Sequence, residues 1–223
     1  TTASNTSGSI TSSVRANTAY GQSIVSWTGD GGTGTVGHGL TSAPEFWITK
    51  DRASADNWLT FFTIVDGSLD AANLNLTNAA GTGSVSLPTS SVFTNDGYTS
   101  SQNLITYCFH SVESYSLVGS YIGNGNADGP FVHCGFRPAF ILTKRTDDLS
   151  PWRLFDNKRP DANFQTYKLE ADSSGAELTG YPYADFLSNG FKIRDDGSYI
   201  NASGGTYVFL AFAESPFKHT NAR

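Results

Sequence analysis

The sequence contains no methionine, only two cysteines and few charged residues. Asp, Glu, Lys and Arg together make up 15% of the 223 residues, against about 25% in an average soluble domain. It also lacks any run of about 18 apolar residues, so no segment is predicted to insert into a membrane. The formal net charge of -6 disfavours nucleic acid and anionic bilayers as partners.

The missing methionine and the pair of cysteines lead to two further expectations. A chain that starts at Thr1 without any Met is expected to be a processed product, a fragment or the ordered part of a longer protein. Cys108 and Cys134 are too few for a disulfide framework. Two buried free thiols are the expected state, and a single bridge between them is the alternative.

Short strands and tight turns are what the composition favours. Polarity comes from Ser, Thr, Asn and 23 Gly, and aromatic residues reach 13%, a combination typical of β-structure and unlike a disordered tail. β-branched or aromatic runs are bounded by Gly, Asp, Asn or Pro. The run from Tyr207 to Phe212 is almost wholly apolar, which predicts a strand covered on both faces.

An internal repeat organises the chain. Five matched blocks recur in the same order, three of them 94 positions apart. The matched pairs are Trp27-Thr28-Gly29-Asp30-Gly31 with Tyr121-Ile122-Gly123-Asn124-Gly125, Pro44 to Lys50 with Pro138 to Lys144, Trp58 with Trp152, Phe93 to Tyr98 with Phe186 to Phe191 at an offset of 93, and Phe109 with Phe212 at an offset of 103.

The repeat predicts the fold and the domain boundaries. We expect an all-β protein with two tandem copies of an antiparallel β-sandwich or jelly-roll-like unit, either separate or merged into one two-sheet body. Residues 23–115 form copy one and residues 116–223 form copy two. Residues 1–22 are rich in Ser, Thr and Asn and read as an extended lead-in or linker.

Residues that differ between the copies are the candidates for binding, because a duplicated scaffold acquires function in its unmatched loops. These loops are residues 67–85, 157–183 and 195–205. Within them we single out Tyr181 and Tyr183 as exposed aromatic contacts and Asp195 and Asp196 as polar contacts. Trp58 and Trp152, by contrast, recur at one repeat position, as core residues do.

Catalytic and metal motifs are weak. Asp147-Asp148 and Asp195-Asp196 are acidic doublets in turns, no Gly-x-Ser-x-Gly elbow occurs, and His38 and His133 stand at nearly equivalent positions, which indicates a structural role. We therefore expect no enzyme and no cofactor. Asn124, Asn126 and Asp128 start a calcium-loop pattern, but the downstream Glu is absent, so a plain turn is favoured and calcium is the alternative.

Several further segments have a recognisable pattern: Gly8 to Thr18, Ser23 to Gly29, Gly39 to Pro44, Gly119 to Val132, Phe136 to Phe140, Asp156 to Arg159, Asp185 to Phe191 and Ala211 to Lys218. These segments resemble a repeated β-rich unit of tail-fibre and other virion proteins of marine and environmental phages. Copy one lacks one acid of the pattern, because His110-Ser111 stands where copy two has Ala213-Glu214.

This resemblance implies a place on a bacteriophage particle, in its tail or a fibre. It implies contact with other virion proteins, with copies of itself in a homo-oligomer such as a trimer, and with a host cell-surface glycan. It also implies that another copy of the unit precedes residues 1–18. A secreted lectin-like carbohydrate-binding module and a glycan-degrading jelly-roll enzyme are the alternatives.

Overall fold

The computed structural model describes residues 2–96, 98, 100–159 and 164–217. These residues form two compact units. Unit 1 contains the chain up to Leu74 together with Gly81–Ser111, and unit 2 contains Asn75–Ala80 together with the chain from Val112 onward. Gly97 and Lys218, which belong to a matched block and to the phage-like segments, lie outside the described residues.

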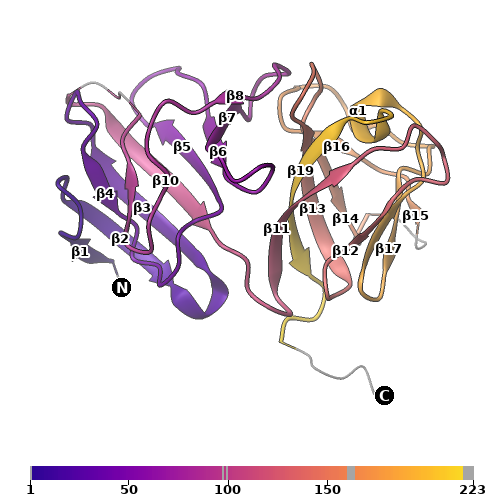
Figure 1. Ribbon diagram of the computed structural model, residues 1–223, viewed down its shortest axis with the longest axis horizontal. Coiled ribbons are helices and arrows are strands. Elements are labelled where there is room, and N and C mark those ends of the chain that lie inside the picture. The colour runs from indigo at the N-terminus through magenta and orange to yellow at the C-terminus, as the bar shows by residue number, and fades with distance from the viewer. Residues whose placement is uncertain (1, 97, 99, 160–163, 218–223) are drawn as a thin grey trace. The chain divides into compact units, whose positions relative to one another are not determined.

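Unit 1 is a two-layer β-structure, and all its paired strands are antiparallel (Figure 1). An eight-stranded sheet in the order β1-β2-β3-β10-β5-β6-β7-β8 faces the two-stranded sheet β4-β9 across a core that includes Trp27, Trp47 and Phe93. Its elements are β1 (Ala3–Asn5), β2 (Ser12–Asn17), the 3-10 turn η1 (Thr18–Tyr20), β3 (Gln22–Thr28), β4 (Thr35–Gly37), β5 (Phe46–Asp51), β6 (Leu59–Phe62), β7 (Asp70–Asn73), β8 (Gly81–Thr82), β9 (Val92–Thr94) and β10 (Asn103–Phe109).

Unit 2 repeats this architecture with a larger second layer (Figure 1). The five-stranded sheet β11-β19-β13-β14-β16 faces the four-stranded sheet β12-β18-β17-β15 across a core of its own. Its elements are β11 (Ser116–Ile122), β12 (Phe131–His133), β13 (Pro138–Arg145), β14 (Arg153–Asp156), β15 (Phe164–Gln165), β16 (Leu169–Glu170), β17 (Ala184–Leu187), β18 (Gly190–Ile193), the short helix α1 (Ser198–Asn201) and β19 (Thr206–Ala213).

The pairing register confirms the duplication. In unit 1, β10 lies between β3 and β5, and in unit 2, β19 lies between β11 and β13. Leu104 pairs with Trp27 as Tyr207 pairs with Tyr121, and both pairs are related by the offsets of 103 and 94 found in the sequence. As predicted for an apolar run, β19 is buried on both faces. Each copy is thus a separate sandwich with its own core.

One buried cross-strand pair shows how the copies diverged. Val25 pairs with Thr106 in unit 1, while the equivalent pair in unit 2 is Gly119 with Phe209. A Cβ added to Gly119 would lie 2.5 Å from Cζ of Phe209, so the phenyl ring occupies the space of the missing side chain. Unit 1 divides the side-chain volume between the two strands, whereas in unit 2 the strand β19 carries nearly all of it, and both pairs fill the core closely.

The lead-in predicted for residues 1–22 is wrong. Ser12–Asn17 forms β2 and pairs with β3 from Ser13–Ser26 to Asn17–Gln22, and Ala3–Asn5 extends the sheet as β1. Ile10 and Val14 are buried in the core of unit 1. These few apolar side chains suffice because β2 only needs to cover one edge of an existing sheet.

The block matched at an offset of 93 is also misaligned. In unit 1, β9 carries Phe93 and pairs with β4. In unit 2, the strand equivalent to β4 is β12, and its partner is β18, which carries Phe191. Phe186 lies on β17, the strand paired with β18 on its other side. The Asn189-Gly190 turn belongs to this additional hairpin of unit 2, so its likeness to Asp96-Gly97 was a likeness of turn residues alone.

The acid that copy one lacks at Ser111 is supplied by Glu45, which directly precedes β5. The backbone N–H and hydroxyl of Ser111 donate to the Glu45 carboxylate at 2.6 and 2.5 Å. In unit 2, Glu214 itself accepts from Arg137 at 3.1 Å and from Asn157 at 2.7 Å. A carboxylate therefore fastens the end of the central strand in both units.

The Val–Thr and Gly–Phe pairs predict a test of the packing. Gly119→Val should lower the free energy of unfolding by about 1–3 kcal/mol, because the new side chain overlaps Phe209. In a Phe209→Thr background the same change should be nearly neutral or stabilising, because the unit 1 pair is then restored. Denaturant unfolding of the four proteins of this double-mutant cycle measures the coupling, and additive effects would contradict it.

Candidate functional site

The turn that follows β11 is built on a buried asparagine that the sequence analysis did not single out. The Asn201 side-chain amide donates to Oδ1 of Asn124 at 3.1 Å and to the carbonyl of Asn126 at 2.7 Å. Its Oδ1 accepts from the N–H of Asn124 at 2.8 Å. Lys192 binds the Asp128 carboxylate at 2.8 Å, and this hydrogen-bonded contact holds the pKa of Asp128 below its usual value.

Hydrogen-bond donors therefore reach the oxygens of Asn124 and Asp128 that the calcium interpretation would use. This arrangement is that of a chain of Asx turns. Among the described residues, no group of three or more His, Cys, Asp or Glu side chains is placed to hold a metal ion. The geometry thus favours the plain turn, and any calcium binding would need Lys192 and Asn201 to move away.

Unit 1 contains the same arrangement. The buried Asn95 amide donates to Oδ1 of Asp30 at 2.8 Å and to the carbonyl of Gly32 at 3.0 Å. Asp30 and Gly32 are the repeat equivalents of Asn124 and Asn126. Asn95, however, directly follows β9, whereas Asn201 comes from α1. Different segments therefore deliver the same amide group.

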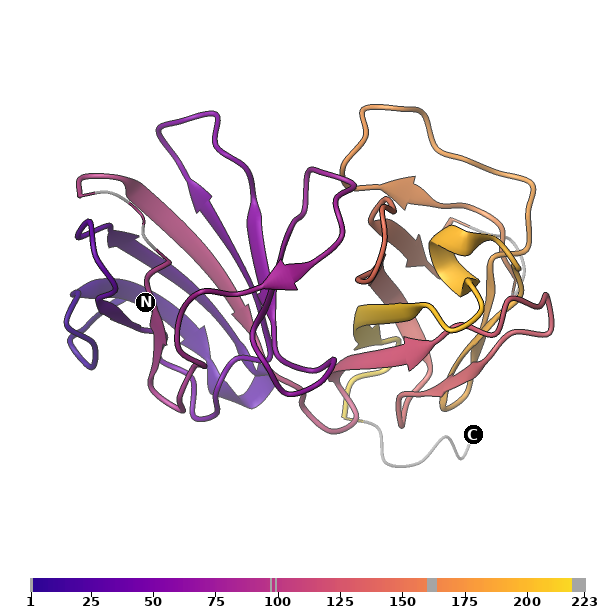
Figure 2. The same cartoon turned by 45° about the horizontal axis from the view of Figure 1, so that its top comes forward.

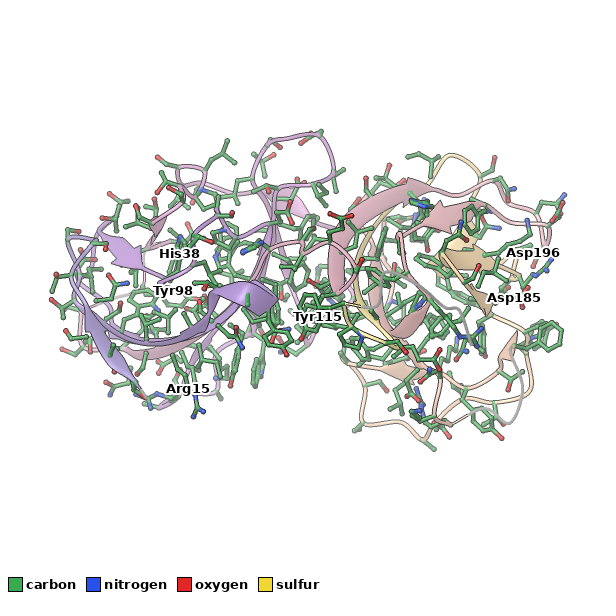
Figure 3. All side chains as sticks on the ribbon, turned by 90° about the horizontal axis from the view of Figure 1, so that it is seen from below. Arg15, His38, Tyr98, Tyr115, Asp185 and Asp196 are labelled. Atoms are coloured by element: carbon green, nitrogen blue, oxygen red, sulfur yellow. The ribbon has the colours of Figure 1, made fainter. Side chains whose placement is uncertain are left out.

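Asp195 joins this turn to a second cluster. It is buried, its carbonyl accepts from the Asn201 amide at 2.9 Å, and its carboxylate accepts from the Gly197 N–H at 2.8 Å and from the Tyr199 hydroxyl at 2.7 Å. Asp195 is therefore buried among internal hydrogen bonds and does not present its carboxylate as the polar contact that we predicted. Asp196 is exposed (Figure 3).

Two buried cations, two tyrosines and one glutamate form the second cluster, which we call the cation–tyrosine cluster: Arg153, Lys168, Glu170, Tyr183 and Tyr199. Cζ of Arg153 lies 4.2 Å from the centre of the Tyr199 ring. Nζ of Lys168 lies 4.3 Å from that ring centre and 4.6 Å from the centre of the Tyr183 ring. Glu170 forms an ion pair with Arg153 and approaches Lys168 at 4.0 Å.

Burial changes the proton affinities in this cluster. It lowers the pKa of Lys168 to about 8, helped by the positive charge of Arg153 and opposed by Glu170 and Asp195. It raises the pKa of Tyr199, and the hydrogen bond to Asp195 acts in the same direction. Burial of two cations is tolerated because each lies against an aromatic face and a carboxylate.

The cluster fastens the unmatched segments of copy two. Lys168, Glu170 and Tyr183 belong to the segment around 157–183, and Tyr199 belongs to 195–205. In Figure 2 the described part of the first segment forms a wide orange loop at the margin of unit 2. Cation–π contacts and ion pairs hold it against α1, so the loop is anchored at its base.

Anchoring leaves a set of apolar side chains at the surface of this segment, and we call them the loop patch: Phe164, Leu169, Leu178 and Tyr181. All four are exposed, and Tyr181 is the most exposed of them at 64%. Backbone hydrogen bonds join Lys168 to Leu178 in both directions, so these two residues form a β-bridge. The Tyr181 ring lies 6.5 Å from that of Tyr183.

The aromatic predictions therefore have mixed outcomes. Tyr181 is exposed as predicted, but Tyr183 is 5% exposed because its ring covers Lys168. Trp152 is fully buried as predicted, but its repeat equivalent Trp58 is 37% exposed, although each residue directly precedes its strand, β14 and β6 respectively.

Arg153, Lys168, Glu170, Tyr199 and Asn201 are the residues that sequence reasoning missed. One signal existed: Arg153 replaces Leu59 of copy one directly beside the matched Trp152. An arginine at an inward-facing position predicts a carboxylate partner. Its partners lie in unmatched segments, so no spacing rule could identify them.

The two cysteines and the paired histidines do not belong to the cation–tyrosine cluster. Cys108 and Cys134 are free and buried, as expected, and burial raises the pKa of each thiol to about 12. His38 is fully buried; its Nδ1 accepts from the Leu40 N–H, so Nε2 donates to the Thr89 carbonyl at 3.1 Å. Those bonds give His38 a structural role. His133 is exposed at the end of β12.

Comparison with known families covers nearly the whole chain. A family model described as "Domain of unknown function (DUF7483)" matches residues 1–216. The chain belongs to this family. The match extends over both units. No curated protein and no solved structure matches the chain.

No helix within the described part of the chain is long and apolar enough to cross a membrane.

The cation–tyrosine cluster predicts a pH dependence of stability. Folded Lys168 has a pKa of about 8, below the unfolded value of about 10.4. The unfolded chain therefore binds more protons between these values, and raising the pH stabilises the fold. Between pH 7 and pH 9, the wild type should gain about 1 kcal/mol relative to Lys168→Met.

Denaturant unfolding at pH 7, 8 and 9 measures this difference. Tyrosines and thiols contribute with the opposite sign, but they are common to both proteins and cancel. Exposed Lys158 provides the control: Lys158→Met should follow the wild-type curve. Parallel curves for the wild type and Lys168→Met would contradict the prediction.

Proposed function

We propose that the protein is a non-enzymatic structural component of a bacteriophage virion that contacts a host cell-surface glycan through unit 2. The observation that carries this proposal is the contrast between the two copies. Their sandwiches are built to one plan, while copy two alone carries an anchored loop with an exposed apolar patch. Functions added to a duplicated scaffold are expected in such loops.

The virion part of the proposal is supported by the resemblance of the sequence segments to units of tail-fibre proteins. The architecture is compatible with it. Antiparallel sandwiches with free thiols held inside give a rigid particle component, and the low charge leaves surfaces rich in Ser, Thr and Asn hydroxyls and amides. We propose assembly with other virion proteins and with copies of itself.

The glycan part is supported by the loop patch. Tyr181 presents an aromatic face to solvent at 64% exposure, and flat aromatic faces stack on the apolar side of pyranose rings. The base of the loop is held by buried ion pairs, so little ordering entropy is lost when a ligand binds. A secreted lectin-like module would use the same patch, and only the location of the protein separates the two functions.

Binding to a panel of bacterial surface polysaccharides tests the glycan contact. Tyr181→Ala should weaken binding roughly tenfold, the effect of removing an aromatic anchor. Phe131→Ala removes another exposed aromatic side chain of unit 2, outside the loop, and should leave binding unchanged. Equal losses in both variants, or release of shortened polysaccharide during the assay, would overturn the proposal.

Immunoelectron microscopy tests the location. Antibodies raised against the recombinant chain should label intact phage particles at the tail or its fibres. Labelling should disappear when the antibodies are first absorbed with the recombinant protein. Detection of the chain only in the medium, and not on particles, would favour the secreted lectin-like module.

A further inference from the structure

The outward face of the large sheet of unit 1 carries an ordered row of side chains. Arg15 on β2 pairs with Ile24 on β3, Ile24 pairs with Tyr107 on β10, and Tyr107 pairs with Ile48 on β5. Core residues such as Val25 and Leu104 alternate with them and point inward. Because neighbouring strands lie about 4.8 Å apart, Arg15 and Tyr107 are about 10 Å apart along this row.

Arg15, Ile24 and Tyr107 of this row line a groove of about 610 Å³. Ile24 is 44% exposed there, an unusual position for a large aliphatic side chain in the middle of a sheet. Asn17 and Gln22, which pair across β2 and β3 in the next row, also line the groove. The groove therefore combines an apolar floor with amide groups and one cation.

The charge of the groove differs from that of the chain. The chain has 20 acidic and 14 basic residues, yet the residues that line the groove include Arg15 and no Asp or Glu. Within the part of the chain that the structure describes, the Arg15 side chain makes no ion pair and no hydrogen bond, and it projects away from the sheet (Figure 3). Its five N–H donors are available to a ligand.

The equivalent face of unit 2 has lost this chemistry. The repeat equivalents of Ile24, Ile48 and Tyr107 are Val118, Leu142 and Leu210 respectively, and all three are aliphatic and buried. The exposed arginine, aliphatic and tyrosine row is thus specific to copy one.

We propose that this groove binds an acidic oligosaccharide, with Arg15 holding a sugar carboxylate and the Ile24–Tyr107 floor contacting the apolar face of the ring. A guanidinium binds a carboxylate through two parallel hydrogen bonds. One arginine matches a singly charged carboxylate better than a phosphate dianion, which needs several donors. Asn17 and Gln22 are placed to bind ring hydroxyls.

This site lies in another unit than the loop patch and needs neither the virion location nor Tyr181. If the groove does not bind a carboxylate, the proposed function is unaffected. If the loop patch does not bind a glycan, the proposal for the groove is unaffected. The Tyr181→Ala variant should bind the acidic probe as the wild type does, so the two proposals fail separately.

Isothermal titration calorimetry with trigalacturonate tests the proposal, with neutral trigalactose and galactose 1-phosphate as comparison probes. The wild type should bind trigalacturonate and should bind the other two at least tenfold more weakly. Arg15→Gln should weaken trigalacturonate binding by at least about tenfold, as expected for a charge-assisted hydrogen-bonded pair. Arg15→Lys should show an intermediate loss, since lysine keeps the positive charge but cannot donate two parallel hydrogen bonds to one carboxylate.

Arg52→Gln is the matched control, because it removes the charge of another exposed arginine of unit 1 that does not line this groove. Its affinity should stay within twofold of the wild type. Ile24→Gln should weaken binding without changing net charge. Absence of trigalacturonate binding, equal losses in Arg15→Gln and Arg52→Gln, or tighter binding of the neutral or phosphorylated sugar would overturn the proposal.

Discussion

The register of the central strand determines which side chains of each unit are buried. β10 and β19 are hydrogen-bonded on both sides, to β3 and β5 and to β11 and β13. A shift by one residue would turn Leu104 or Tyr207 away from the core and expose every inward side chain of that strand. The Gly119–Phe209 pair shows that even side-chain volume is fixed across this register, because the ring fills the space left by the glycine. The loops, the buried cluster and the groove are all positioned by these ladders.

Strands and duplication were predictable because both depend on local pattern and on spacing. The strand expected at Tyr207 to Phe212 is present as β19, with one further residue at each end. The offsets of 94 and 103 are also the offsets of the pairing register. Residues 10–14 show why the N-terminal strand was missed: Ile10, Ser12 and Val14 alternate correctly, but polar composition outweighed a pattern of three residues.

The candidate site was less predictable, because its chemistry comes from contacts distant in the sequence. The location of the unmatched segments was available from the repeat, and Tyr181 is exposed there as expected. Nothing in the sequence indicates that Tyr183 and Asp195 turn inward, since this depends on Lys168 and Tyr199 meeting in space. Buried cations in turn explain why a segment with little regular secondary structure has a definite conformation: an unpaired Lys168 or Arg153 would carry a large desolvation cost.

Asn95 and Asn201 make the same hydrogen bonds from segments of different length and origin. The turn after β3 or β11 therefore depends on where one carboxamide lies in space and not on which segment of the chain carries it. A connecting loop of another length and sequence would support the turn equally well, provided that it returned an amide to the same point.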